Sequence, residues 1–137
     1  MKNEYIAGDL VKFATNTYTI VNFEENFLHN KICYALISTN STKTAFVADR
    51  DILPIPLTTE ILEKNGWKIE DVNPNDLSNI VSKGIMYRAI KDKEILFFQK
   101  GASVFTCPLN WRKIEIRYVH QLQHLLFGLG LNSEMEV

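Results

Sequence analysis

The chain is short of cysteine, of long apolar runs and of any strong excess of charge, and each shortage excludes a class of protein. Its two cysteines, Cys33 and Cys107, lie far apart in apolar segments and cannot by themselves form a Cys-x-x-Cys zinc or redox motif. Apolar runs such as 95–98 and 125–131 fall well below the roughly 18 residues that a membrane-spanning helix requires. We therefore expect two buried, reduced thiols and no membrane segment.

The N-terminus lacks the features of a secretion signal. Residues 1–13 contain neither a continuous apolar core nor a small-residue cleavage site, so we expect a cytoplasmic location. With 137 residues, of which 46% are hydrophobic and 23% charged, the composition is that of an ordinary folded protein. We interpret the chain as a single domain, 1–137, with a barrel-like subdomain at 5–57 and a second subdomain at 58–137.

Common catalytic motifs are also missing. There is no glycine-rich phosphate loop and no Gly-x-Ser-x-Gly nucleophile turn. His120 and His124 have the spacing of the zinc ligands in a His-Glu-x-x-His protease, but Gln121 replaces the glutamate that activates the metal-bound water. No spacing shows a third ligand near them, and we predict no catalytic residue, no metal site and no cofactor. The side chains considered as third ligands are His29, Glu24, Glu25, Asp49 and Asp51.

What the first half of the chain does contain is a series of short strands. Runs of β-branched and aromatic residues at 8–13, 17–23, 32–38 and 43–49 are separated by polar turns, which predicts an antiparallel meander. Such closely spaced strands bury one face by forming a strongly curled sheet or a small barrel. The sequence GDLV at 8–11, followed by these strands, resembles the start of small Src-homology-3-like barrels.

The next segment predicts an edge and a short helix. Pro54 and Pro56 cannot both donate hydrogen bonds within a central strand, so this piece is an edge strand or an extended connector. Thr58 or Thr59 is a suitable N-cap for a helix of about two turns. Gly66 is placed to end that helix in the left-handed conformation.

The second half predicts another antiparallel sheet and a final helix. Strand-like runs lie at 85–90, 94–98, 103–107 and 113–118, and a polar turn joins the first two. The last helix starts near Arg117 and ends at Gly128 or Gly130. The predicted fold class is α+β, with an N-terminal curled antiparallel sheet or small barrel, a short connector helix, a second antiparallel sheet and a C-terminal amphipathic helix.

Charge is unevenly distributed, although the formal net charge is -1. Residues 83–117 carry eight basic and three acidic groups, a net charge of +5, with aromatic residues interleaved. This pattern favours a surface on which bases stack and phosphates are held. A sheet with inward aromatics and outward charges has the same pattern. The residues that we predict to bind an anionic ligand are Tyr87, Arg88, Lys91, Lys93, Trp111, Arg112 and Arg117.

The C-terminal helix has a second candidate surface. At about 100° per residue, His120, His124 and Phe127 point away from the apolar stripe centred on Leu122. Two imidazoles four residues apart grip a metal ion weakly, whereas an exposed aromatic beside two polar rings is typical of a protein interface. We predict that His120, His124 and Phe127 form an outward interface with another protein or a second copy of the chain.

Two stretches, DILPIPLTTEILEKNGW at 51–67 and RYVHQLQHLLFGLG at 117–130, resemble a pattern in small uncharacterised proteins of gut anaerobic bacteria and their phages or prophages. That resemblance implies a phage-type protein acting in the cytoplasm of the host cell, and it transfers no catalytic residue. Accessory phage proteins of this size often bind a host protein or a nucleotide stoichiometrically, or fill a place in a virion.

Two functional hypotheses follow, and an enzyme is not favoured. In the first, the protein binds or sequesters a nucleotide or nucleic acid through the basic-aromatic sheet. In the second, it is a protein-interaction or virion-assembly module that uses the outward face of the C-terminal helix and inhibits a host protein or self-associates.

Overall fold

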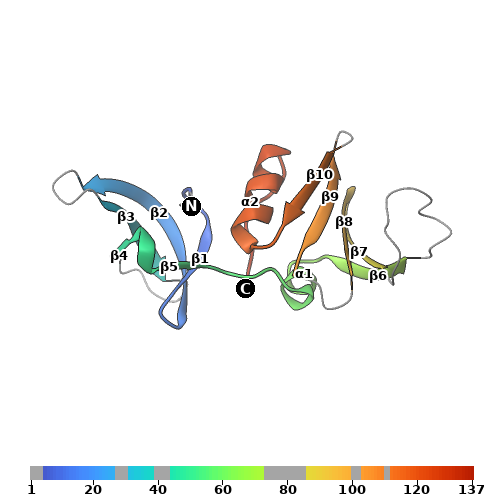
Figure 1. Ribbon diagram of the computed structural model, residues 1–137, viewed down its shortest axis with the longest axis horizontal. Coiled ribbons are helices and arrows are strands. Elements are labelled where there is room, and N and C mark those ends of the chain that lie inside the picture. Colours follow the sequence, from blue (N-terminus) through green and yellow to red (C-terminus); the bar gives the residue numbers. More distant parts are fainter. Residues whose placement is uncertain (1–4, 27–30, 39–43, 73–85, 100–102, 110–111) are drawn as a thin grey trace. The chain divides into compact units, whose positions relative to one another are not determined.

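The computed structural model describes residues 5–26, 31–38, 44–72, 86–99, 103–109 and 112–137 (Figure 1). These residues form two antiparallel five-stranded sheets and two α-helices, which confirms the predicted α+β fold. The chain divides into two compact units. The first unit contains residues 1–55 and 118–135, and the second contains residues 56–117 and 136–137.

The sheet of the first unit is a meander to which one further strand returns. A 3-10 helix, η1 (Asp49–Asp51), precedes the last strand, and the strand order is β4-β3-β2-β1-β5. The sheet is open, because β4 and β5 lie at its two edges, so the small barrel considered from the sequence is not closed. All four predicted strands are present. The strands are β1 (Leu10–Phe13), β2 (Asn16–Asn26), β3 (Lys31–Ser38), β4 (Thr44–Ala48) and β5 (Ile52–Pro54).

Alternation along these strands places their apolar residues on one face, which forms the core of the first unit. Ile20 lies opposite Leu36, which lies opposite Ala45, so one side of three neighbouring strands is apolar. A register shift between Ile20 and Asn22 interrupts the pairing of β2 with β3, and such a bulge bends the strand. The buried cluster contains Tyr5, Val11, Ile20, Tyr34, Leu36, Val47 and Ile52.

Hydrogen bonds define both the start and the end of helix α2 (Val119–Gly128). At its start the Gln121 Oε1 atom accepts a hydrogen bond of 3.1 Å from the backbone N–H of Tyr118. At its end Gly130 has a φ of 74°, and the N–H of Leu131 donates to the carbonyl of Leu126 at 2.9 Å. The glycine stop is therefore confirmed. The helix belongs to the first unit, whereas the division expected from the sequence placed it with residues 58–137.

The sheet of the second unit has the order β10-β9-β8-β7-β6. Four of its strands were predicted, and the Lys91–Glu94 pair closes the expected turn between β7 and β8. Strand β6 was not predicted, because three of its five residues are charged and its apolar alternation is short. The strands are β6 (Lys68–Val72), β7 (Met86–Lys91), β8 (Glu94–Gln99), β9 (Phe105–Leu109) and β10 (Arg112–Ile116).

Helix α1 (Thr59–Lys64) confirms the short capped helix. The Thr58 hydroxyl accepts from the N–H of Ile61 at 3.2 Å, and Gly66 has a φ of 88°. The N–H of Trp67 then donates to the carbonyl of Leu62 at 3.0 Å, and both of these side chains are buried. Neither described helix combines the length and apolar character that crossing a membrane would demand.

Candidate functional site

The turn at the start of β1 places a carboxylate inside the first unit. The N–H of Asp9 donates to the carbonyl of Ile6 at 3.1 Å, and Gly8 has a φ of 94°, as the third position of a type II turn requires. The N–H of Gly8 donates to the carbonyl of Ile20 at 2.8 Å, which holds the turn on β2. The Asp9 Oδ2 atom accepts from the N–H of Ile6 at 2.8 Å. The backbone of the turn therefore fixes the position of the Asp9 side chain.

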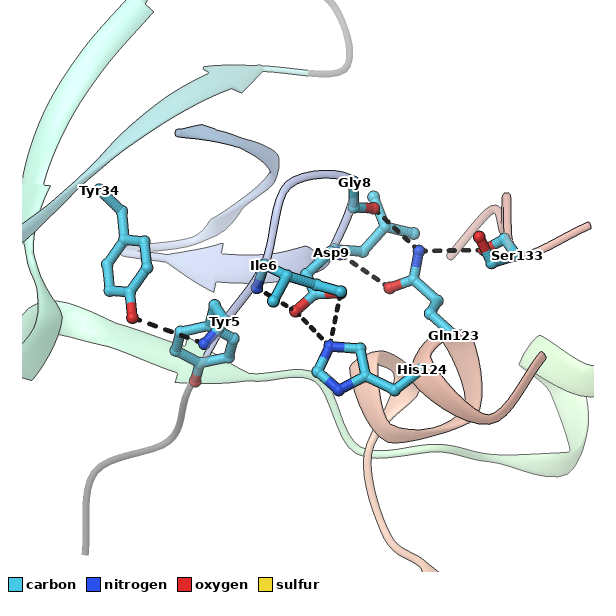
Figure 2. Close-up of polar contacts among 9 residues, drawn as sticks. Tyr5, Ile6, Gly8, Asp9, Tyr34, Gln123, His124 and Ser133 are labelled. Atoms are coloured by element: carbon cyan, nitrogen blue, oxygen red, sulfur yellow. Dashed lines mark hydrogen bonds and ion pairs between the residues drawn. The ribbon is translucent and has the colours of Figure 1, made fainter. Parts of the chain in front are cut away.

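Figure 2 shows that this carboxylate meets His124 of α2. The Nε2 atom of His124 lies 2.9 Å from Oδ1 and 2.8 Å from Oδ2 of Asp9. Asp9 is only 2% exposed, and the pKa of its carboxyl is raised because burial disfavours the charged form. The hydrogen bond from Ile6 and the nearby His124 offset part of that rise. The pair thus joins the first turn of the unit to its last helix.

Gln123, the neighbour of His124, makes the same connection through neutral hydrogen bonds. It is buried, and its Oε1 atom accepts from the N–H of Leu10 at 2.9 Å. Its Nε2 atom donates to the carbonyls of Gly8 at 3.0 Å and Ser133 at 3.2 Å (Figure 2). One amide therefore satisfies backbone groups from the turn, the first strand and the C-terminal segment.

His120 is the main correction to the predicted interface. It is 5% exposed, and its ring lies 5.0 Å from the ring of Tyr5 and 5.9 Å from the stacked ring of Tyr118. The helical count correctly predicted that His120 lies on the side of α2 away from Leu122, but Tyr5 covers that side. The Tyr5 segment is itself anchored, since its N–H donates to the Tyr34 hydroxyl at 3.5 Å. The outward assignment of His120 is therefore wrong.

The buried imidazole of His120 has an unusual electrostatic position. In the described part of the chain its Nδ1 atom has no hydrogen-bond partner. Burial lowers its pKa to about 4, and the neighbouring His124, with ring centroids 5.6 Å apart, adds to the effect. A neutral imidazole is much more stable in this environment than a charged one. Protonation of His120 should therefore destabilise the folded unit.

The Asp9–His124 pair resembles two members of a hydrolase triad, but the third member is missing from its contacts. The partners shown for His124 are Asp9 and the His120 ring, and neither is a nucleophile. Among the described residues no group of three or more His, Cys, Asp or Glu side chains is placed to hold a metal ion. Asp9 and His124 therefore form a polar contact that joins the N-terminal turn to α2.

Sequence reasoning missed Asp9 and Gln123 as members of this cluster. A signal for Asp9 was present, because Gly-Asp before an apolar strand indicates a turn and an aspartate buried beside it needs a charged or hydrogen-bonding partner. No comparable signal exists for Gln123. Its side chain supplies the hydrogen bonds that the carbonyl of Gly8 and the N–H of Leu10 need where α2 covers them.

Four of the seven predicted anion-binding residues, Tyr87, Arg88, Lys91 and Lys93, lie on β7 or in the turn after it. Tyr87 stacks on the buried Phe98 with ring centroids 5.7 Å apart. Arg88 is paired with Glu70, with Nη2 at 2.9 Å and Nε at 3.0 Å from the carboxylate. Lys91 donates through Nζ to the carbonyl of Asn65 at 2.8 Å. Internal partners therefore engage each of these three residues.

The other four residues are Lys93, Arg117, Trp111 and Arg112. Lys93 is exposed in the turn after β7, and the Arg117 guanidinium lies 3.8 Å from the Glu115 carboxylate beyond β10. Strands β8 and β9 separate β7 from β10, a distance of about 14 Å at the usual strand spacing. Trp111 and the side chain of Arg112 fall outside the described residues.

Cys107 is buried as predicted and Cys33 is half-buried, and both are free thiols. Burial, with a smaller contribution from Glu94, raises the pKa of Cys107, so this thiol is a poor nucleophile near neutral pH.

The first unit also carries the large apolar side chains that the described residues leave exposed. Phe127 is 69% exposed, so this member of the predicted interface does face outward. The others are Ile6, Val21, Phe46, Leu53 and Leu131. Comparison of the chain with protein-family models, with curated proteins and with solved structures found no match.

Proposed function

We propose that the protein is a non-enzymatic binding module that recognises another protein through the C-terminal end of α2, with Phe127 as the anchor. The observation that carries this proposal is the 69% exposure of Phe127 on a helix whose other candidate interface residues are engaged inside the unit. Aromatic side chains are enriched in protein interfaces and are among the residue types that most often anchor them.

Several hydrogen bonds anchor the helix that carries Phe127. The Asp9–His124 pair and the hydrogen bonds of Gln123 fix α2 against the first turn, and Gly130 and Leu131 close the helix directly after Phe127. A helix anchored in this way presents its aromatic side chain at a defined place, and aromatic anchors dominate the energetics of many interfaces.

The chemistry around Phe127 indicates the kind of surface that would cover it. Helix α2 contains no Asp, Glu, Lys or Arg, and Leu131 nearby in sequence is 39% exposed. Interface cores are depleted of charge in the same way. We infer a partner with an uncharged apolar pocket wide enough for a phenyl ring, and the resemblance to phage proteins makes a host protein the first choice.

Site-specific photo-crosslinking tests the proposal. A crosslinking amino acid at position 127 should trap one discrete partner in host cells, whereas the same group at the exposed Glu63 of α1 serves as the matched control. With the identified partner purified, Phe127→Ala should weaken binding about 10-fold or more, as for other aromatic anchors. Equal adducts from both positions, or unchanged affinity of Phe127→Ala, would contradict the proposal.

A second candidate function is binding of a nucleotide or nucleic acid by the second unit. It is favoured by the net charge of +5 on residues 83–117. Such binding would weaken steeply with salt and would fall in Lys93→Ala and Arg112→Ala variants, because both remove phosphate-binding charge. Phe127→Ala should leave it unchanged. Absence of binding across a panel of nucleotides and oligonucleotides at low salt would rule it out.

A further inference from the structure

The edges of the two sheets differ in how well they resist pairing with another strand. An edge strand presents a row of outward N–H and C=O groups, and proteins protect such rows with charges, prolines, bulges or short length. In the part of the chain that the structure describes, the edge strands are β4, β5, β6 and β10.

Three of these edges carry protective features. Strand β5 has only three residues and ends in Pro54. Strand β6, KIEDV, has three charged residues, and β10, RKIEI, has three as well. Strand β4 differs from all of them, because its five residues TAFVA contain neither a charge nor a proline.

Strand β4 is also regularly paired along its inner side. All five of its residues pair in unbroken register with β3, from Thr44 opposite Ile37 to Ala48 opposite Cys33. Val47 is buried in the core, whereas Phe46 at the centre of the strand is 68% exposed. A strand held in this way offers its outer edge in the geometry that a further strand needs.

We propose that β4 pairs with β4 of a second copy of this chain, antiparallel about a two-fold axis that passes at Phe46. In this register Thr44 of each copy lies opposite Ala48 of the other, Ala45 lies opposite Val47, and the two Phe46 side chains lie opposite each other. The two phenyl rings then share one face of the joined sheet, as cross-strand aromatic pairs do. The contact is isologous and closes with two copies.

We expect the pairing strand to come from a second copy of the chain because the sequence of β4 is complementary to itself. It has an aromatic residue at the centre with a small or β-branched residue on either side, so the pattern is nearly the same in both directions. No like charges meet in this register. The equivalent pairing of β6 about its centre would place Glu70 against Glu70 of the second copy, which is destabilising.

The size of the contact sets its strength. Five residues from each copy bury much less than the roughly 1,600 Å² of a standard stable interface. The dimer should therefore be weak, with a Kd in the micromolar to millimolar range, and should form as the protein concentration rises. This surface is independent of Phe127, so failure of one proposal leaves the other standing.

Sedimentation velocity of the full chain tests the dimer. The weight-average sedimentation coefficient should rise towards the dimer value between about 1 µM and about 1 mM, a range that spans the expected Kd. Phe46→Lys should abolish this rise, while the matched variant Leu53→Lys on the protected edge β5, where Leu53 is 55% exposed, should retain it. A monomer across the whole range, or a dimer that survives Phe46→Lys, overturns the proposal.

Disulfide trapping tests the register directly. In a Cys33→Ala, Cys107→Ala background, Phe46→Cys should form a disulfide-linked dimer on mild oxidation. The two-fold axis places residue 46 of one copy directly opposite residue 46 of the other. Thr44→Cys alone should not form one, but a mixture of Thr44→Cys and Ala48→Cys chains should. Efficient linkage of Thr44→Cys to itself, or no linkage at position 46, would contradict this register.

Discussion

The Nε2 atom of His124 lies within 2.9 Å of both carboxylate oxygens of Asp9, although 115 residues separate the two in the chain. This contact is one of several that join residues 118–135 to residues 1–55 in the same unit. A carboxylate buried in the first turn needs a hydrogen-bonding partner, and the last helix supplies it. The fold of the first unit is therefore completed only when both ends of the sequence are present.

The first prediction concerns the coupling between these two residues. Asp9→Ala and His124→Ala should each lower the free energy of unfolding, because each removes the contact between the two side chains, and His124→Ala leaves the buried Asp9 carboxyl with only the hydrogen bond from Ile6. The double variant should lose less than the sum of the two, with a coupling free energy of about 2 kcal/mol. Urea unfolding of the four proteins measures this value. Strict additivity would show that the contact contributes nothing to stability.

The second prediction concerns pH and His120. Its pKa in the folded protein is about 4, below the ordinary value of 6.5, so the unfolded chain takes up the proton first as pH falls. The free energy of unfolding should therefore fall between pH 6.5 and about pH 4, by up to about 3 kcal/mol. Unfolding by urea at a series of pH values measures the loss. His120→Phe, which keeps a ring against Tyr5 but cannot be protonated, should remove most of it.

Asp9 acts in the opposite direction within the same experiment. Its folded pKa is raised above 3.8, so its buried charge costs stability at neutral pH, and that cost disappears as pH falls through the raised pKa. In the His120→Phe background, acidification should accordingly cost less stability with Asp9 present than with Asp9→Asn, while Glu60 and Glu70, whose pKa values are lowered, still contribute some acid loss. A His120→Phe protein with the same acid loss as the parent chain would show that other groups control the pH dependence.

The fold was largely accessible from sequence because its signals are local. Alternation in TYTIVNF and EILFF predicted strands, and the threonine and glycine around α1 predicted its two ends. Strand β6 was missed because a charged edge strand acquires its pairing from β7, in which Arg88 lies opposite Glu70. That information is held by another part of the chain and does not appear in the pattern of KIEDV.

The candidate site was much less accessible, for the same reason. The helical count gave the correct direction of His120 relative to Leu122, but whether that direction faces water depends on where Tyr5 lies. The pairing of Asp9 with His124 likewise depends on a contact across the whole sequence. Phe127 could be predicted because it lies beyond the reach of the N-terminal turn and remains exposed.

The third prediction compares two glycines that end helices. Gly66 has a φ of 88°, which an alanine adopts only with strain, and an added methyl group there would meet Lys91 at an ordinary 3.7 Å. Gly66→Ala should therefore lower stability by about 1 kcal/mol through the backbone alone. Gly128 is helical with no atom within 4 Å of an added methyl group, so Gly128→Ala should raise stability by about 0.5 kcal/mol. Equal shifts in the urea midpoint would contradict this difference.

The fourth prediction concerns the residue that separates this helix from a zinc-protease motif. Gln121→Glu restores the His-Glu-x-x-His sequence, yet it should not create a zinc site, because His120 is buried against Tyr5 and His124 is bound to Asp9. In the structure Gln121 caps α2 by accepting the N–H of Tyr118, and a glutamate performs that role equally well near the positive end of a helix. We therefore expect Gln121→Glu to keep or raise stability by up to about 0.5 kcal/mol, and Gln121→Ala to lower it by about 1 kcal/mol.

Calorimetric titration with zinc and urea unfolding separate these two roles. Zinc should give no more heat with Gln121→Glu than with the parent chain, and the order of stability should be glutamate, glutamine, alanine. Tight zinc binding by Gln121→Glu would mean that Tyr5 and Asp9 leave α2 readily, since both histidines must abandon their present contacts to coordinate a metal. Such a result would show that the contacts of His120, His124 and Asp9 within the first unit are not stable.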